Sequence, residues 1–260
     1  MSDAVSTGGR TVLITGASSG IGAALARHLA VQGTTVGLVA RRADRLAEVL
    51  AECREHAPES RMWVADVGER DAAAALVDTA WDAWGGIDVL VNNAAIPGVR
   101  PVTRCTAEEV ERVMDVNFHA PVRLALAVLP RMLERGSGTI VNVSSLGGRL
   151  GIPRESAYCA SKFALCGWTE AVKLDLWNTP VKVKLIIPGA VDTEIWDKPD
   201  EEGAAYDGPK VPAAEVAADI AATFDDDGFE YYLPDMKPVA LFKTSDIDAY
   251  MARSMEILDV

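Results

Sequence analysis

The chain has 260 residues, of which 25 are basic and 38 acidic, and its formal net charge is −13. Apolar residues make up 49% and charged residues 24%, fractions typical of globular proteins, which excludes disordered and fibrous classes. Because an acidic surface repels phosphate backbones and anionic membranes, we expect a small-molecule partner, and neither nucleic acid nor a membrane surface. The length suits a single α/β domain over residues 1–260.

Cysteines and histidines form no recognisable site in the sequence. The four cysteines lack a C-x-x-C spacing and the three histidines lack an H-E-x-x-H motif, so we expect no metal and a reducing, cytoplasmic environment. Residues 1–10 are polar and lack the apolar segment of a signal peptide, which predicts a flexible N-terminus and no export. No run approaches the roughly 18 apolar residues of a membrane span.

Short β-branched runs alternate with longer stretches of helical periodicity, which is typical of βαβ units around a mostly parallel sheet. The expected strands are Thr11–Thr15, Thr35–Ala40, Arg61–Asp66, Ile87–Asn92, Gly138–Ser144, Val181–Pro188 and Phe229–Leu233. The expected helices are Ile21–Gln32, Ala43–Glu55, Arg70–Trp84, Ala107–Glu134, Ala157–Trp177, Pro212–Thr223 and a C-terminal helix over 245–258. We predict a Rossmann-type, doubly wound α/β fold of about seven strands flanked by helices, with a ligand at the carboxyl ends of the strands where the winding reverses.

A glycine-rich turn separates the first strand from the first helix. It reads Thr15-Gly16-Ala17-Ser18-Ser19-Gly20-Ile21-Gly22. Its three glycines let the chain turn sharply and let a pyrophosphate approach the backbone, and the helix N-terminus supplies N–H donors. No Gly-Lys-Ser/Thr follows, which disfavours a nucleoside-triphosphate P-loop. Taken alone, the turn could also serve tight packing.

Further motifs follow this turn, in the order Asn92-Asn93-Ala94, Ser145, Tyr158-x-x-x-Lys162 and Pro188-Gly189-x-x-x-Thr193. Together with the G-x-x-x-G-x-G turn, they resemble the short-chain dehydrogenase/reductase family over roughly Thr11 to Thr193. The resemblance implies an NAD(P)-dependent oxidoreductase that exchanges hydride with a ketone or secondary alcohol, and a homodimer or homotetramer. One departure is Ala95, where the family motif N-N-A-G has glycine.

Tyr158 and Lys162 are four residues apart on one expected helix face, so their side chains can converge. A nearby ammonium favours the phenolate and lowers the pKa of the tyrosine toward the physiological range. The resemblance implies that Tyr158 is the general acid/base and that Ser145 holds the substrate oxygen. Strand alternation directs the neighbouring Ser144 to the opposite face. Outside this context, Y-x-x-x-K would indicate an amphipathic helix with an interfacial tyrosine and a solvated lysine.

Asn117 falls in the middle of an expected helix, where asparagine is a poor helix former and a poor local choice often marks a functional constraint. The resemblance implies that it breaks the helix locally and acts in catalysis by binding a water that relays protons from Lys162. The alternative is an exposed polar residue.

The end of the second strand bears on the choice between NAD and NADP, because an acidic residue there binds the ribose hydroxyls and a basic one the 2′-phosphate. Position 40 is alanine and Arg41 and Arg42 follow, so NADP is favoured over NAD and no carboxylate there repels the phosphate. Alternatively, the two arginines open the next helix as ordinary surface charge.

The resemblance implies further cofactor contacts along the chain. They are Gly16, Ser18, Ser19, Gly20, Ile21 and Gly22 in the turn, Asp66 and Val67 beside the adenine, Asn93 and Ala94, Tyr158 and Lys162 at the nicotinamide ribose, and Pro188, Gly189, Val191 and Thr193 near the carboxamide and pyrophosphate.

Two segments allow two interpretations each. Residues 194–210, rich in acid, proline and glycine, form either a substrate lid or a solvated surface loop. A helical stripe at the C-terminus either docks on its own domain or covers the pocket or a neighbouring subunit. Its members are Ile247, Tyr250, Met251, Ser254, Met255 and Leu258.

Two rival functions keep the same fold. An epimerase or dehydratase usually has a longer C-terminal substrate domain than the residues after Thr193 provide. A cofactor-binding regulator or scaffold is expected to lack one of Ser145, Tyr158 or Lys162, yet all three are present. The sequence therefore favours an NADP-dependent oxidoreductase that acts on a small carbonyl compound or alcohol.

Overall fold

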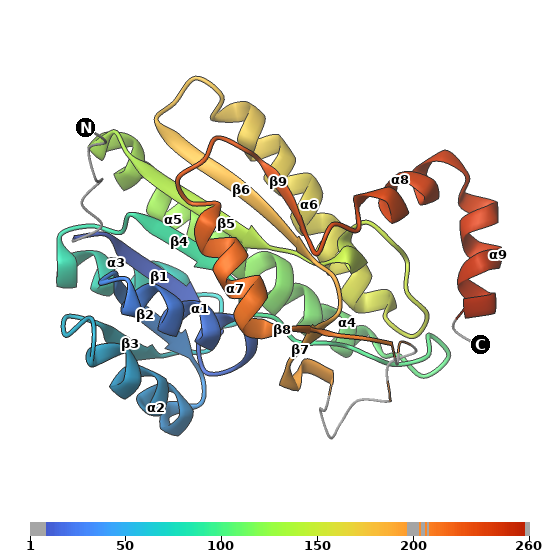
Figure 1. Ribbon diagram of the computed structural model, residues 1–260, viewed down its shortest axis with the longest axis horizontal. Coiled ribbons are helices and arrows are strands. Elements are labelled where there is room, and N and C mark those ends of the chain that lie inside the picture. Colours follow the sequence, from blue (N-terminus) through green and yellow to red (C-terminus); the bar gives the residue numbers. More distant parts are fainter. Residues whose placement is uncertain (1–8, 197–202, 204–205, 207, 258–260) are drawn as a thin grey trace.

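Seven strands form one sheet at the centre of the structure (Figure 1). The computed structural model describes residues 9–196, 203, 206 and 208–257. The strands are β1 (Thr11–Thr15), β2 (Thr35–Ala40), β3 (Arg61–Val64), β4 (Val89–Asn92), β5 (Gly138–Val143), β6 (Val181–Pro188) and β9 (Glu230–Leu233). Their order is β3-β2-β1-β4-β5-β6-β9, and every neighbouring pair is parallel. The winding reverses between β1 and β4, which confirms the predicted Rossmann-type, doubly wound fold.

Helices cover both faces of this sheet (Figure 1). One face carries α1 (Gly20–Val31), α2 (Ala43–Arg54) and α7 (Ala213–Ala222), and the other α3 (Ala72–Trp84), α5 (Ala120–Arg135) and α6 (Ser156–Asp175). Successive strand residues point to opposite faces, so Val12 and Ile14 enter one core cluster while Leu13 enters the other. Because both faces are covered, the strands are almost continuously apolar.

The long helix expected over 107–134 is interrupted. It consists of α4 (Ala107–Met114), a π-helical turn (Asp115–His119) and α5. Asn117 lies in the π-helical turn, and its side-chain amide binds both backbone polar groups of Ile96. The helical segment expected over 107–134 is therefore present, with the local break that the resemblance implies at Asn117.

Strand β3 ends at Val64, before the predicted end at Asp66. The Asp66 carboxylate accepts a hydrogen bond from Gly68 N at 2.9 Å. This side-chain bond to the backbone two residues later forms a turn, which ends the strand.

Several short elements lack a counterpart in the prediction. They are the 3₁₀ turns η2 (Leu146–Gly148) and η3 (Glu194–Trp196), the strand pair β7 (Val191–Asp192) and β8 (Val211–Pro212), and helix α8 (Lys237–Ser245). Helix α9 (Ile247–Ile257) matches the expected C-terminal helix, and α8 and α9 extend away from the sheet at the right of Figure 1.

Parts of three predicted segments lie outside the described residues. These parts are 1–8 of the N-terminus, 197–202, 204–205 and 207 of the 194–210 loop, and Leu258 of the C-terminal stripe. Within the described ranges, no helix is both long and apolar enough to span a bilayer.

Candidate active site

The glycine turn presents bare backbone at the N-terminus of α1. Gly16 has a φ of +69°, in the left-handed region that favours glycine. A Cβ on Gly16 would lie 2.8 Å from Ala94 Cα, and a Cβ on Gly22 would lie 2.5 Å from Gly16 O. Asn93 Nδ2 donates to Thr15 O at 2.9 Å and so ties the turn to the end of β4. These two glycines therefore serve the tight packing of the turn, which was the alternative interpretation. The N-terminus of α1 also offers backbone N–H groups of the kind that bind phosphate.

Ser145, Tyr158 and Lys162 meet at the carboxyl end of β5. Ser145 begins η2, where its Oγ accepts a hydrogen bond from Gly147 N at 3.1 Å, and its hydroxyl also hydrogen-bonds Tyr158. Tyr158 and Lys162 both lie on α6, and Lys162 Nζ is 5.7 Å from the centroid of the tyrosine ring. The structure thus brings together the three side chains that the motifs singled out.

Burial dominates the protonation of this pair. Although part of the Tyr158 side chain is accessible, desolvation raises the pKa of its hydroxyl above the ordinary value, and the hydrogen bond with Ser145 opposes this shift. Burial also lowers the pKa of Lys162 to about 8, and its Nζ donates to Val143 O at 2.9 Å. In this structure the pKa of Tyr158 is raised, and not lowered as expected from a nearby ammonium, because desolvation makes the largest contribution.

Ser144 points away from the tyrosine. Its hydroxyl lies 3.3 Å from Lys162 O and 3.1 Å from Cys166 Sγ, and its side chain is buried. This arrangement agrees with the alternation expected at the end of β5, which leaves Ser145 facing the site.

Asn117 is fully buried, so the alternative of an exposed polar residue was wrong. Its Oδ1 accepts from Ile96 N at 2.8 Å, and its Nδ2 donates to Ile96 O at 2.9 Å and to Ser161 Oγ at 3.1 Å. Asn117 therefore ties the segment after β4 to α6, beside Lys162.

Arg42 reaches back over the glycine turn. Its Nη2 donates to Ser19 Oγ at 2.7 Å and to Ser18 Oγ at 3.2 Å, while its Nη1 donates to Glu194 Oε2 at 2.9 Å. The sequence places no carboxylate at the end of β2, but the tertiary structure brings one there from the segment after β7.

Arg41 faces Asp66 across a longer ion pair of 3.6 Å, and the same carboxylate is bound by Arg112 at 2.7 Å. Arg41 and Arg42 therefore do not act only as surface charge at the start of α2.

Two apolar residues among the expected cofactor contacts, Ile21 and Val67, belong to or pack against the hydrophobic core clusters.

The segment after β6 borders the other side of the glycine turn. Pro188 ends β6, Gly189 N donates to the last residue of β9 at 3.0 Å, and Val191 begins β7. Gly20 has a φ of +54°, and a Cβ placed on it would lie 3.0 Å from Thr193 Cγ2. Thr193 therefore lies directly against the turn.

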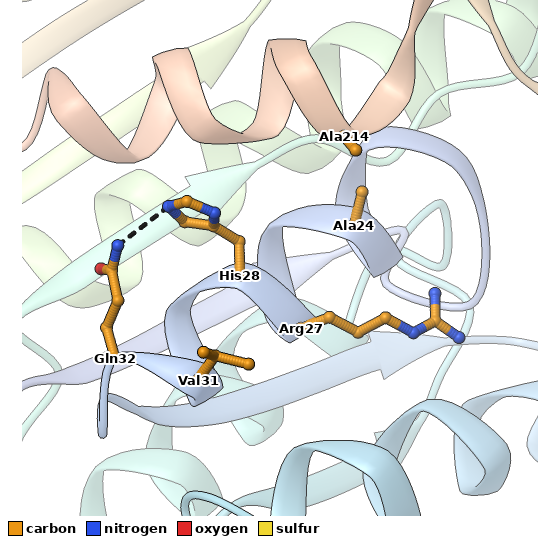
Figure 2. Close-up of a pocket in the computed structure, with 6 residues that line it drawn as sticks. All are labelled: Ala24, Arg27, His28, Val31, Gln32 and Ala214. Carbon is orange, nitrogen blue, oxygen red and sulfur yellow. Dashed lines mark hydrogen bonds between the residues drawn. The ribbon is translucent and has the colours of Figure 1, made fainter.

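A separate hollow lies on the outer face of α1 (Figure 2). Its lining consists of Ala24, Arg27, His28, Val31, Gln32 and Ala214. None of these residues belongs to the predicted site, so the hollow is not the candidate active site. Among the residues that the structure describes, no group of three or more histidine, cysteine, aspartate or glutamate side chains could hold a metal ion.

Sequence reasoning missed two contributions to the site. Glu194 was expected only as part of a segment that forms either a substrate lid or a solvated surface loop. Its ion pair with Arg42 joins residues 152 positions apart, which no local pattern signals. Ser161 lies between Tyr158 and Lys162 in the Y-x-x-x-K motif, so its place within this motif was the available signal.

Comparison with known proteins agrees with this fold. The sequence family described as short chain dehydrogenase matches residues 10–203. Galactitol 2-dehydrogenase from Agrobacterium fabrum is 34% identical over 256 residues, which cover 95% of this chain and 95% of that protein. The chain therefore belongs to the short-chain dehydrogenase/reductase family of oxidoreductases.

Two solved structures extend the comparison. A short-chain dehydrogenase/reductase from Burkholderia phymatum in complex with NAD has a TM-score of 0.85 and 26% identity, covering 94% of this chain and 95% of that chain. A metagenomic short-chain oxidoreductase in complex with NADP has a TM-score of 0.73 and 31% identity, covering 86% and 96%. Two other curated relatives are longer, and the chain spans 64% and 52% of their length.

Proposed function

We propose that the protein is an NADP-dependent oxidoreductase that interconverts a small ketone and the corresponding secondary alcohol, with Tyr158 as general acid/base. The observation that carries this proposal is the meeting of Ser145, Tyr158 and Lys162 at the carboxyl end of β5, on the same edge of the parallel sheet as the glycine turn. The name of the galactitol 2-dehydrogenase relative refers to oxidation at a secondary alcohol, which supports the substrate class.

The residues around the turn fit a nicotinamide dinucleotide. We assign its pyrophosphate to the turn and the N-terminus of α1, its adenine end to Asp66 and Val67, and its nicotinamide end to the segment Pro188–Thr193. When bound, the cofactor supplies or accepts the hydride. Arg41 and Arg42 support NADP over NAD, while the solved neighbours hold one cofactor each.

Each catalytic side chain has a distinct proposed task. The raised pKa of Tyr158 keeps its hydroxyl protonated at neutral pH, as proton donation to a developing alkoxide requires. Ser145, which already hydrogen-bonds Tyr158, donates to the substrate oxygen and holds it near the phenol. Lys162 supplies positive charge close to the tyrosine ring, and Asn117 positions α6 through Ser161.

The proposed role of the Tyr158 hydroxyl as proton donor is tested by Tyr158→Phe, which removes only that hydroxyl. We expect turnover to fall by roughly a hundredfold or more because the proton donor is lost. Binding of NADPH, followed by its fluorescence, should stay close to that of the wild type. A variant that turns over a ketone at the wild-type rate would contradict the assignment of Tyr158.

The rival functions predict different results in the same assays. A regulator or scaffold would bind the cofactor without turnover on a panel of ketones and alcohols, and an epimerase or dehydratase would convert its substrate without net change in NADPH. We further propose that the protein acts in the cytoplasm as a homodimer or homotetramer.

A further inference from the structure

The carboxylate of Glu194 bridges two arginines at the edge of the glycine turn. Its Oε2 accepts from Arg42 Nη1 at 2.9 Å, and its Oε1 binds Arg45 Nη1. Arg42 and Arg45 lie at the start of α2, whereas Glu194 is the first residue of η3, about 150 positions later in the sequence. All three side chains are partly exposed, so a ligand could reach them.

The position of Arg42 relates this ion pair to the cofactor site. The same guanidinium donates to the hydroxyls of Ser18 and Ser19, inside the turn that we assign to the cofactor. One edge of Arg42 therefore faces the cofactor site, and its remaining Nη1 is bound by Glu194.

A 2′-phosphate needs the same donors that Glu194 uses. Carboxylate and phosphate oxygens both accept charge-assisted hydrogen bonds from guanidinium N–H groups, in similar geometry. Hydrogen bonds from Arg42 and Arg45 hold the pKa of Glu194 below its ordinary value, so this carboxylate is ionised at neutral pH. Two anions cannot share one guanidinium edge without mutual repulsion.

We propose that Glu194 is a specificity-determining residue whose carboxylate competes with the 2′-phosphate of NADP for Arg42 and Arg45. The inference rests on the proposed binding of a nicotinamide dinucleotide at the glycine turn. NADPH must displace Glu194 from the arginines, whereas NADH, which lacks the phosphate, leaves the ion pair intact. Glu194 thus lowers the preference for NADPH that the arginines alone would give.

Glu194→Gln tests the competition because glutamine keeps the shape of glutamate and removes its charge. We expect the Kd of NADPH to fall by about threefold to tenfold, while the Kd of NADH changes by less than about twofold. Glu48→Gln is the matched control, since Glu48 is exposed and the same substitution removes the same charge from α2, three residues after Arg45. This control should alter neither Kd, and both constants are measured by titration of cofactor fluorescence.

Arg42→Ala separates failure of the inference from failure of the proposed function. If this variant weakens NADPH and NADH equally, the proposed preference for NADP is wrong. If it weakens NADPH selectively while Glu194→Gln behaves like Glu48→Gln, the competition is wrong and the NADP assignment stands. Weaker NADH binding by Glu194→Gln would also overturn the inference, because the carboxylate would then be a ligand of the ribose.

Discussion

Lys162 lies in α6 with 2% of its surface exposed, and its Nζ donates to Val143 O. Holding an ammonium group away from water costs free energy, and the folded protein therefore binds the lysine proton less tightly than the unfolded chain does. The pKa of Lys162 falls to about 8 in the folded state. A lysine in an unfolded chain has a pKa of about 10.4.

This difference predicts how the free energy of unfolding depends on pH. Between the two pKa values the unfolded chain carries the proton and the folded chain does not, so stability rises with pH. Relative to Lys162→Met, the wild type should gain roughly 2 kcal/mol between about pH 7 and about pH 10. Urea unfolding of both proteins at the two pH values measures the gain. A stability difference that stays constant would show that the pKa of Lys162 is not lowered.

The turn between β1 and α1 sets the path of the backbone at the proposed cofactor site. Alanine is a better helix former than glycine, so local propensity alone would favour Gly22→Ala. In the structure, however, the added Cβ would lie 2.5 Å from Gly16 O and 2.6 Å from Asn93 Nδ2. The turn must shift to accept the methyl group, and packing outweighs propensity.

We therefore expect Gly22→Ala to weaken NADPH binding by roughly tenfold and to lower the melting temperature. The matched control is Gly167→Ala in α6, where a Cβ has no neighbour within 4 Å. That variant should keep the affinity and should be slightly more stable, because only the helix propensity changes. Equal cofactor affinity in the two variants would exclude a role of the turn in binding.

At the scale of the whole molecule, α9 leaves an apolar stripe uncovered. Tyr250 is 8% exposed and donates to Gly151 O at 3.1 Å, so it docks the helix on the rest of the chain. Ile247, Met251 and Met255 are 44%, 52% and 46% exposed, which favours the interpretation that a second surface covers them.

Deletion of residues 246–260 tests this interpretation. We expect a smaller particle by light scattering, or a higher KM, because the stripe no longer covers a neighbouring subunit or the pocket. Tyr250→Phe is the control: it removes one hydrogen bond and keeps the stripe, so particle size and KM should not change. If the deletion leaves KM, kcat and particle size as in the wild type, α9 only docks on its own chain.

Local patterns determined the architecture and singled out Ser145, Tyr158 and Lys162. Apolar runs such as that of β1 are continuous because both sheet faces are covered, so their spacing predicted strands, helices and a parallel sheet. The glycines of the turn and the Tyr158–Lys162 spacing are local as well. The net charge of the chain disfavours polyanionic partners. It gives no information about local positive charge, such as that of Arg42 beside the glycine turn.

Only the tertiary structure decided the contacts between distant segments and the protonation that follows from burial. Asn117 lies in a π-helical turn and hydrogen-bonds the backbone of Ile96, and Glu194 reaches Arg42 across 152 positions of sequence. The pKa of Tyr158 rises because desolvation exceeds the influence of its neighbours. Sequence periodicity reports which faces are buried, but the distances between side chains on different elements, and their separation from water, are set when those elements pack.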